Sequence, residues 1–367
     1  MYTFIFKKAG RTFMQNSTNS SPTPRFFAAA NGFSGFRSYF PVVFNSSDFD
    51  RLFVLKGGPG TGKSSFLRSL LSFGEENGFS CEAVLCSSDP HSLDGVILEK
   101  SGKRFAALDG TAPHTRDTEI PGAADEIINL GENWNTEQLI SNRRLIQELA
   151  KKKRINYEKA YSALNNAGII TDVENGERRC CVREEKIKSD AKSLAESLIS
   201  SQKRGKEIIR LNDSFGRFGS FKVDTLEALS SQVIKVENTP LASVLFMGEL
   251  RKFLKDADIS MTVFPDVFNS EAVSAIYLHE SRTSVVLSDS SCLDVKVSDF
   301  ISGDISPELL DSLSQARTRF LDEAKKYFTF ASDLHFELEK IYISAMNFGR
   351  NEILLEKTIE KIKKHTN

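Results

Sequence analysis

One short segment of the chain combines residue types and spacing that could hold a phosphate. Residues 57–64 read GGPGTGKS, and Gly57, Gly62, Lys63 and Ser64 fit the P-loop pattern G-x-x-x-x-G-K-[ST]. Glycines let successive backbone N–H groups point into one concavity, lysine brings a mobile positive charge to the outer phosphates, and the serine hydroxyl is a ligand for Mg²⁺. The predicted nucleotide-binding residues are Gly57, Gly58, Pro59, Gly60, Thr61, Gly62, Lys63, Ser64 and Ser65.

An aspartate that could help to hold the metal follows a second apolar segment. Residues 104–109, RFAALD, form an apolar run that ends in Asp109. This is the pattern of a Walker B strand, whose acid holds Mg²⁺, although any buried strand can end in Asp at a turn. We predict Ser64 and Asp109 as metal ligands. Gly110 comes next, where many ATP-hydrolysing proteins have Glu, so the sequence names no hydrolytic base.

Other polar residues are candidates by position alone. SSDP (87–90) follows a predicted strand, and open α/β sheets bind ligands at the carboxyl ends of their strands. Asp89 would accept the proton if the phosphoryl group passed to a hydroxyl, whereas His91 and His114 more simply belong to surface loops. The arginines considered as fingers for the transferring phosphoryl group are Arg116, Arg143, Arg144, Arg251 and Arg282.

A sheet and a helix must position these residues. The apolar run 52–55 before the glycines predicts a buried strand, and apolar residues at helical spacing over 66–71 predict a helix whose N-terminus faces the phosphates. Further strands are predicted over 80–86, 95–99 and 104–109. The fold class expected from this order is α/β, with a parallel sheet of the P-loop NTPase type.

Two long helical arms are expected beside the sheet. Apolar residues at helical spacing predict a long helix that Gly168 ends, and VENGE (173–177) then turns the chain into a returning helix, which together make a helical hairpin. The basic run KKKR (151–154) within it is interpreted as a solvated face rather than a nucleic-acid contact. Near the C-terminus, Ser306 caps a second long helix whose apolar stripe over 309–341 resembles a coiled-coil seam.

The two halves of the chain share a pattern that indicates a duplicated fold. Residues 80–109 and 260–289 have equal length, align without gaps and both end in Asp, and FSGFR (33–37) resembles FGSFK (218–222). The alternative is an unrelated α/β domain with similar strands. Where the first half has the glycine loop, LFMGELRKFL (245–254) is predicted to stand in the second half, so the second copy is expected to be degenerate and to lack a phosphate site.

Length and composition set limits on the organisation. The chain has 367 residues, a formal net charge of −1 and five cysteines. The balanced charge argues against a nucleic-acid or membrane surface, the cysteines indicate neither a disulfide framework nor a zinc site, and no apolar run approaches the length of a membrane span. A cytoplasmic protein is expected. The predicted parts are a disordered leader (1–24), a P-loop nucleotide-binding core (25–132), a helical hairpin arm (133–208), a degenerate P-loop-like core (209–303) and a C-terminal helical arm (304–367).

The N-terminal segment allows two interpretations. Residues 1–47 contain no acidic residue, and MQNSTNSSPTP (14–24) is polar and rich in turn formers. An acid-free, Ser-rich leader can be a transit peptide. We favour a disordered extension, because MYTFIFKK makes a poor amphipathic targeting helix.

Four segments of the chain resemble a known family. RLFVLKGGPGTGKSS, SSDPHSLDGVILE, ALDGTAPHTRD and INLGENW together resemble a bacterial family of uncharacterised tandem P-loop proteins, described as ATPases or as nucleotide-kinase-like. The resemblance covers most of residues 25–170 and the remainder loosely. It implies ATP binding at Gly57–Ser65 and names no substrate. Family members often have a glycine-rich loop in each half, which the second half of this chain lacks.

Three functions are compatible with these patterns. The first is an ATP-binding P-loop NTPase with one nucleotide site and slow hydrolysis, in which Lys63 grips the outer phosphates; ATP is favoured over GTP because no N-K-x-D motif is present. The second is a small-molecule or nucleotide kinase, with Asp89 as the base. The third is a nucleotide-dependent scaffold whose helical arms bind a protein partner.

Overall fold

The first sheet contains the predicted phosphate loop. The computed structural model describes residues 22–199, 205–303 and 305–366. Residues 1–21 of the leader predicted for 1–24 therefore lie outside the described residues. The six strands of this sheet, in spatial order, are β1 (Arg25–Phe27), β5 (Ser80–Leu85), β6 (Leu93–Lys100), β7 (Lys103–Asp109), β4 (Arg51–Lys56) and β8 (Asp125–Asn129). Strands thus form where the apolar runs over 52–55, 80–86, 95–99 and 104–109 predict them.

The sheet is mixed, which corrects the prediction of a parallel sheet. Strand β6 is antiparallel to both β5 and β7, whereas β7, β4 and β8 are parallel. Ser101 and Gly102 join β6 to β7 with positive φ angles of 52° and 72°, the geometry of a two-residue hairpin. A parallel connection needs a dozen or more residues, and the segments on both sides of β6 are shorter than that.

A second sheet has five strands, which in spatial order are β9 (Glu207–Ile209), β13 (Met261–Pro265), β14 (Val273–Leu278), β15 (Thr283–Ser288) and β12 (Gln232–Glu237). They correspond in order and direction to β1, β5, β6, β7 and β4 of the first sheet. As in the first sheet, the middle strand is antiparallel to both neighbours and the outer strands are parallel to theirs. The sheets meet where Phe27 and Leu211 exchange two backbone hydrogen bonds of 2.8 and 3.0 Å.

A small hairpin and a helix accompany each sheet. The hairpins are β2 (Ala29–Gly32) with β3 (Gly35–Ser38) and β10 (Asp213–Gly216) with β11 (Gly219–Lys222), and the helices are α2 (Lys63–Glu76) and α7 (Ala242–Asp256). Helix α9 (Phe348–Thr366) packs beside α2, and α5 (Glu184–Leu198) packs beside α7. The remaining short elements are α1 (Phe40–Val43), η1 (Ser46–Asp48), η2 (Leu130–Asn133), α3 (Thr136–Ser141), α6 (Thr225–Leu229) and η3 (Val297–Phe300).

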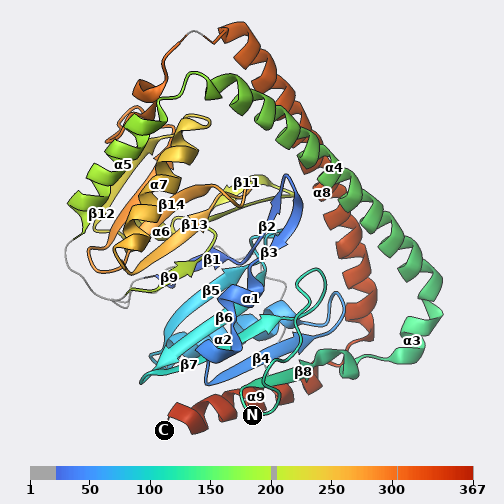
Figure 1. Cartoon of the computed structure of the whole chain (residues 1–367). Helices are drawn as coiled ribbons and strands as arrows, with labels where there is room; N and C mark the ends of the chain where they lie inside the picture. The colour runs from blue at the N-terminus through green and yellow to red at the C-terminus, as the bar shows by residue number, and fades with distance from the viewer. Residues whose placement is uncertain (1–21, 200–204, 304, 367) are drawn as a thin grey trace.

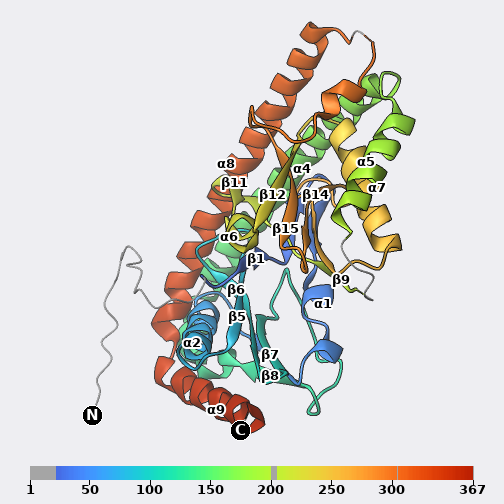
Figure 2. The same ribbon diagram turned by 90° about the vertical axis from the view of Figure 1, so that its left-hand side faces the viewer.

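Two long helices connect the sheets. Helix α4 (Arg143–Arg179) leads from the first sheet to the second, and α8 (Pro307–Ala345) returns beside it (Figure 1), as the turned view of Figure 2 also shows. Ser306 caps α8 as predicted, because its hydroxyl accepts a hydrogen bond from the Leu309 N–H. Because α4 and α8 pack along each other, their apolar stripes are buried between them.

The predicted helical hairpin over 133–208 is wrong. Gly168 does not end α4, which continues through 173–177 to Arg179. The glycine serves packing instead, since a Cβ there would lie 2.7 Å from the Phe33 Cβ. After α4 the chain does not fold back on it: α5 covers α7 of the second sheet, and α8 is the partner of α4.

The second half has a different connection where the first has its glycine loop. Residues 245–254, predicted as the counterpart of that loop, lie inside α7, so this prediction is wrong. The segment between β12 and α7 is NTPL (238–241), which contains no glycine. Among the described residues, no helix is long and apolar enough to cross a membrane.

Candidate functional site

The glycine loop connects β4 to α2 as the sequence predicts. Strand β4 ends at Lys56, and α2 begins at Lys63. Gly60 and Gly62 have φ angles of +69° and +88°, which side chains rarely adopt. The loop thus turns where only glycine is unstrained, and the first turn of α2 leaves its N–H groups at the loop.

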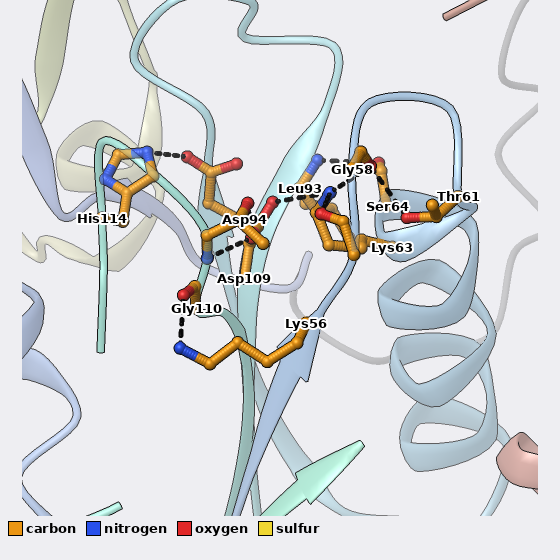
Figure 3. A network of polar contacts seen from close by, with 12 residues as sticks. Lys56, Gly58, Thr61, Lys63, Ser64, Leu93, Asp94, Asp109, Gly110 and His114 are labelled. Carbon is orange, nitrogen blue, oxygen red and sulfur yellow. Dashed lines mark hydrogen bonds and ion pairs between the residues drawn. The ribbon is translucent and has the colours of Figure 1, made fainter. Parts of the chain in front are cut away.

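Lys63 folds back over the loop. Its Nζ donates hydrogen bonds of 2.9 Å to the carbonyl oxygens of Gly57 and of Gly58 (Figure 3). The same Nζ lies 3.6 Å from Oδ2 of Asp109, and the two side chains are only 12% and 16% exposed. Asp109 ends β7 and pairs with Leu55 of β4, so the adjacent strand brings the predicted acid to the predicted lysine.

Asp109 is held in place from its other side. Its Oδ1 accepts hydrogen bonds from the Thr111 N–H and hydroxyl, at 2.9 and 2.5 Å. The next residue, Gly110, is buried, and a Cβ there would lie 2.3 Å from Cγ1 of Val54. Close packing against β4 therefore explains why glycine stands at 110, the position at which the sequence lacks a glutamate.

Ser64 and Asp109 fit the predicted Mg²⁺ site by their chemistry. The Ser64 hydroxyl oxygen accepts a hydrogen bond from the Leu93 N–H at 3.0 Å. Mg²⁺ binds through one or two protein oxygens and completes its shell with phosphate oxygens and water. A hydroxyl and one carboxylate suit that mode. Within the described ranges, no three or more His, Cys, Asp and Glu side chains gather in a cluster that could hold a metal by itself.

The loop is braced by elements that the sequence did not connect with it. Thr61 is fully buried and donates to the Gly58 carbonyl at 2.9 Å. Asn351 of α9 donates to the Thr61 carbonyl at 2.8 Å and accepts from Asn133 at 2.9 Å. The C-terminal helix therefore helps to fix the conformation of the glycine loop.

The two long helices also reach the loop. The backbone amide of Gly60 lies near enough to the carboxylate of Glu339 in α8 to lower its pKa, and His335 lies one turn away with its Nε2 3.5 Å from that carboxylate. Lys153 of α4 lies 3.5 Å from the other ring nitrogen of His335. Burial lowers the pKa of Lys153, and the nearby Lys63 ammonium lowers it further.

Sequence reasoning missed this contribution of the arms. Lys153 belongs to the run 151–154, interpreted above as a solvated face. Lys152 and Arg154 are indeed exposed and pair with acidic residues on their own helix. Lys153, by contrast, is half-buried. The available signal was its spacing, since position 153 lies four residues from both Leu149 and Tyr157 on the apolar face.

Asp89 and the two histidines have other contacts. Asp89 shapes a turn: its Oδ1 accepts from the His91 N–H at 3.1 Å. The His91 ring packs edge-on against Phe218 and Phe221 of the second half. The surface-loop interpretation of His114 is wrong, because this residue is buried, stacked on Phe40 and 3.0 Å from the Asp94 carboxylate.

The five arginine candidates are exposed or engaged elsewhere. Arg143 and Arg144 are exposed at the start of α4. Arg116 is buried against the Ser46 hydroxyl. Arg251 pairs with Glu207, and Arg282 donates to the Leu229 carbonyl, both in the second half of the chain.

The comparisons with known proteins add no assignment. No protein-family model, curated protein or solved structure matches this chain.

Proposed function

We propose that this chain is an ATP-binding P-loop NTPase with one nucleotide site, formed by Gly57–Ser65 and Asp109. The observation that carries the proposal is the meeting of Lys63 with the loop carbonyls and with Asp109 at the end of the adjacent parallel strand. A lysine, an acid and a glycine-rich turn before a helix are the parts that bind and polarise a nucleoside triphosphate.

Each group has a role in the proposed site. The amides of the loop and of the first turn of α2 cradle the phosphates, and Lys63 moves from the Gly57 and Gly58 carbonyls to the outer phosphates. Ser64 and Asp109 hold Mg²⁺, which when bound neutralises charge on the transferring phosphoryl group. ATP is favoured over GTP because the chain lacks N-K-x-D.

Hydrolysis by the isolated chain is expected to be slow. Gly110 leaves no room for a glutamate beside Asp109, and the arginine candidates are either exposed (Arg143 and Arg144) or bound to other groups. With phosphate-binding groups but with glycine at the position of a water-orienting glutamate, turnover should be of the order of 10⁻⁴–10⁻² s⁻¹, as in unassisted switch-type NTPases.

The second half is proposed to be a degenerate copy of the first. Identical strand order and directions over five strands support this, as does the ungapped match of 80–109 with 260–289, which places β13, β14 and β15 at the positions of β5, β6 and β7. The reciprocal pairing of Phe27 with Leu211 fits an approximate two-fold relation between the halves. Since 238–241 contains no glycine, one ATP per chain is expected.

Two other functions stay as alternatives. A kinase would use Asp89 as the base, and its turn does follow β5 close to Leu93, which contacts Ser64. A nucleotide-dependent scaffold would use the arms to bind a partner, but α4 and α8 already cover each other's apolar faces.

The fate of the γ-phosphate in purified protein separates these functions. We expect slow release of inorganic phosphate that Lys63→Ala abolishes and that Lys252→Ala, a change at an exposed residue of α7, leaves unchanged. Rapid transfer to an added metabolite, lost in Asp89→Asn with ATP binding retained, would replace the ATPase by the kinase. ATP binding without any release or transfer would favour the scaffold.

A further inference from the structure

The last turns of α8 lie directly on the phosphate loop. A Cβ on Gly60 would be 2.7 Å from the Glu339 carbonyl oxygen and 3.0 Å from Cγ1 of Ile343. A Cβ on Gly58 would be 3.2 Å from the Tyr342 ring. The Glu339 backbone leaves no room for a side chain at position 60, and at position 58 the Tyr342 ring would have to shift by a few tenths of an ångström, so the loop is shaped to receive α8 as well as a ligand.

Glu339 places an anion on the loop. A Cβ on Gly60 would also lie 3.2 Å from the Glu339 Cα, and the Glu339 carboxylate is near enough to the Gly60 amide for that amide to lower its pKa; amides of such a loop are the groups that would otherwise face a phosphate. Burial alone would raise the pKa of Glu339, but His335, the Gly60 amide and the Lys63 ammonium together hold it below its ordinary value. The carboxylate is therefore charged. A phosphate oxygen that approached the Gly60 N–H would have to compete with this carboxylate for the same donor.

A second lysine belongs to the same group of charges. The Lys153 ammonium lies 3.5 Å from His335, whose ring contacts Glu339. The pKa of Lys153 is lowered by burial and by Lys63, while the Glu339 carboxylate opposes the shift. Two lysines from separate elements thus act on one carboxylate at the loop.

We propose that the Glu339 carboxylate occupies a phosphate position of the loop and is displaced by the nucleotide, whereupon Lys153 becomes the second cation of the phosphate site. This inference rests on the proposed nucleotide site. It gives the α4–α8 pair a role, because the helix that carries Glu339 must adjust when phosphate binds, and it names Lys153 of the arms as a cation of the site.

Calorimetric titration with Mg·ATP tests the proposal through effects of opposite sign. Glu339→Gln removes the competing charge and should bind about tenfold more tightly, whereas Lys153→Ala should bind about tenfold more weakly. The matched controls are Glu337→Gln and Lys152→Ala, exposed neighbours paired on their own helices, and both should stay within about twofold of the wild type. If the substitutions only loosened the packing of α4 against α8, the Mg·ATP affinity of Glu339→Gln and that of Lys153→Ala would change in the same direction.

The outcomes separate this inference from the proposed site. If the wild type binds ATP, Lys63→Ala does not, and Glu339→Gln is unchanged or weaker, the displaced-carboxylate proposal is wrong and the nucleotide site stands. If no variant binds, including Glu339→Gln with its loop exposed, both are wrong. Should Glu339→Gln fail to fold, Glu339→Ala provides the same test, with thermal unfolding confirming the folded state.

Discussion

Replacing Asp109 by Asn should change how ATP binding depends on Mg²⁺. The substitution keeps the shape and the acceptor oxygen for Thr111 but removes the charge 3.6 Å from Lys63. Without Mg²⁺, loss of a negative charge beside the phosphates should strengthen ATP binding. With Mg²⁺, loss of a metal ligand should weaken it. The variant therefore responds in opposite directions in the two conditions.

The size of the effect follows from the Lys63–Asp109 pair. At an effective dielectric of about 20, unit charges 3.6 Å apart interact by about 4–5 kcal/mol. Desolvation and partial exposure reduce this, so we take about 1.5 kcal/mol, the lower end for a hydrogen bond to a charged group. This corresponds to roughly a tenfold change in affinity. The ratio of Kd in EDTA to Kd in Mg²⁺ should fall at least tenfold.

Calorimetry with and without Mg²⁺ measures that ratio. Asp289→Asn is the matched control, because residue 289 aligns with 109 but is exposed at the end of β15 in the half without the glycine loop. It should keep the wild-type ratio. An unchanged ratio in Asp109→Asn would refute the assignment of Asp109 to the metal, and an equal change in Asp289→Asn would place the effect outside the proposed site.

Three further substitutions test packing and charge, all by urea unfolding. Gly168→Ala should destabilise the protein by about 1–3 kcal/mol through overpacking against Phe33. The control Gly176→Ala, in an open stretch of the same helix, should stabilise it by up to about 1 kcal/mol. Changes of the same sign in the two variants would contradict the packing argument. Gly110→Glu should destabilise by a similar 1–3 kcal/mol and not raise turnover, because its Cβ meets Val54; faster hydrolysis would show that the position accepts a base. Burial and the nearby Asp266 raise the pKa of Asp213 to about 7, so the folded state holds this proton more tightly than the unfolded chain, and stability should fall as pH rises from about 4 to about 7. Asp213→Asn should therefore raise the free energy of unfolding by about 2–4 kcal/mol at pH 8 and change it little at pH 4. The control Asp172→Asn, at an exposed position, should leave it unchanged at both pH values. A gain of equal size at pH 8 and pH 4 in Asp213→Asn would refute the raised pKa.

Local features were readable from the sequence because they depend on neighbouring residues. The apolar runs before the glycine loop and before Asp109 became β4 and β7, within one or two residues of the predicted bounds. Ser306 caps the helix that follows it, as predicted, and accepts the backbone N–H three residues on. These signals require no knowledge of distant contacts.

The arms could not be paired from the sequence. An apolar stripe shows that a helix needs a partner but does not name one, so α4 was paired with the following helix instead of α8. Gly168 carries the same ambiguity, since a helix end and a close packing contact both call for glycine. Lys153 and Glu339 come together at the loop only through that pairing, which is why the site prediction ended with Asp109.

The most direct test of the central claim is the stoichiometry and affinity of Mg·ATP binding measured by calorimetry. We predict one ATP per chain, with an affinity that falls about ten- to a hundredfold in Lys63→Ala, the loss of about 1.5–3 kcal/mol expected for a charge-assisted contact. Lys252→Ala should bind as the wild type does. Wild-type affinity in Lys63→Ala, or two ATP per chain with one retained in that variant, would contradict a single nucleotide site at the glycine loop.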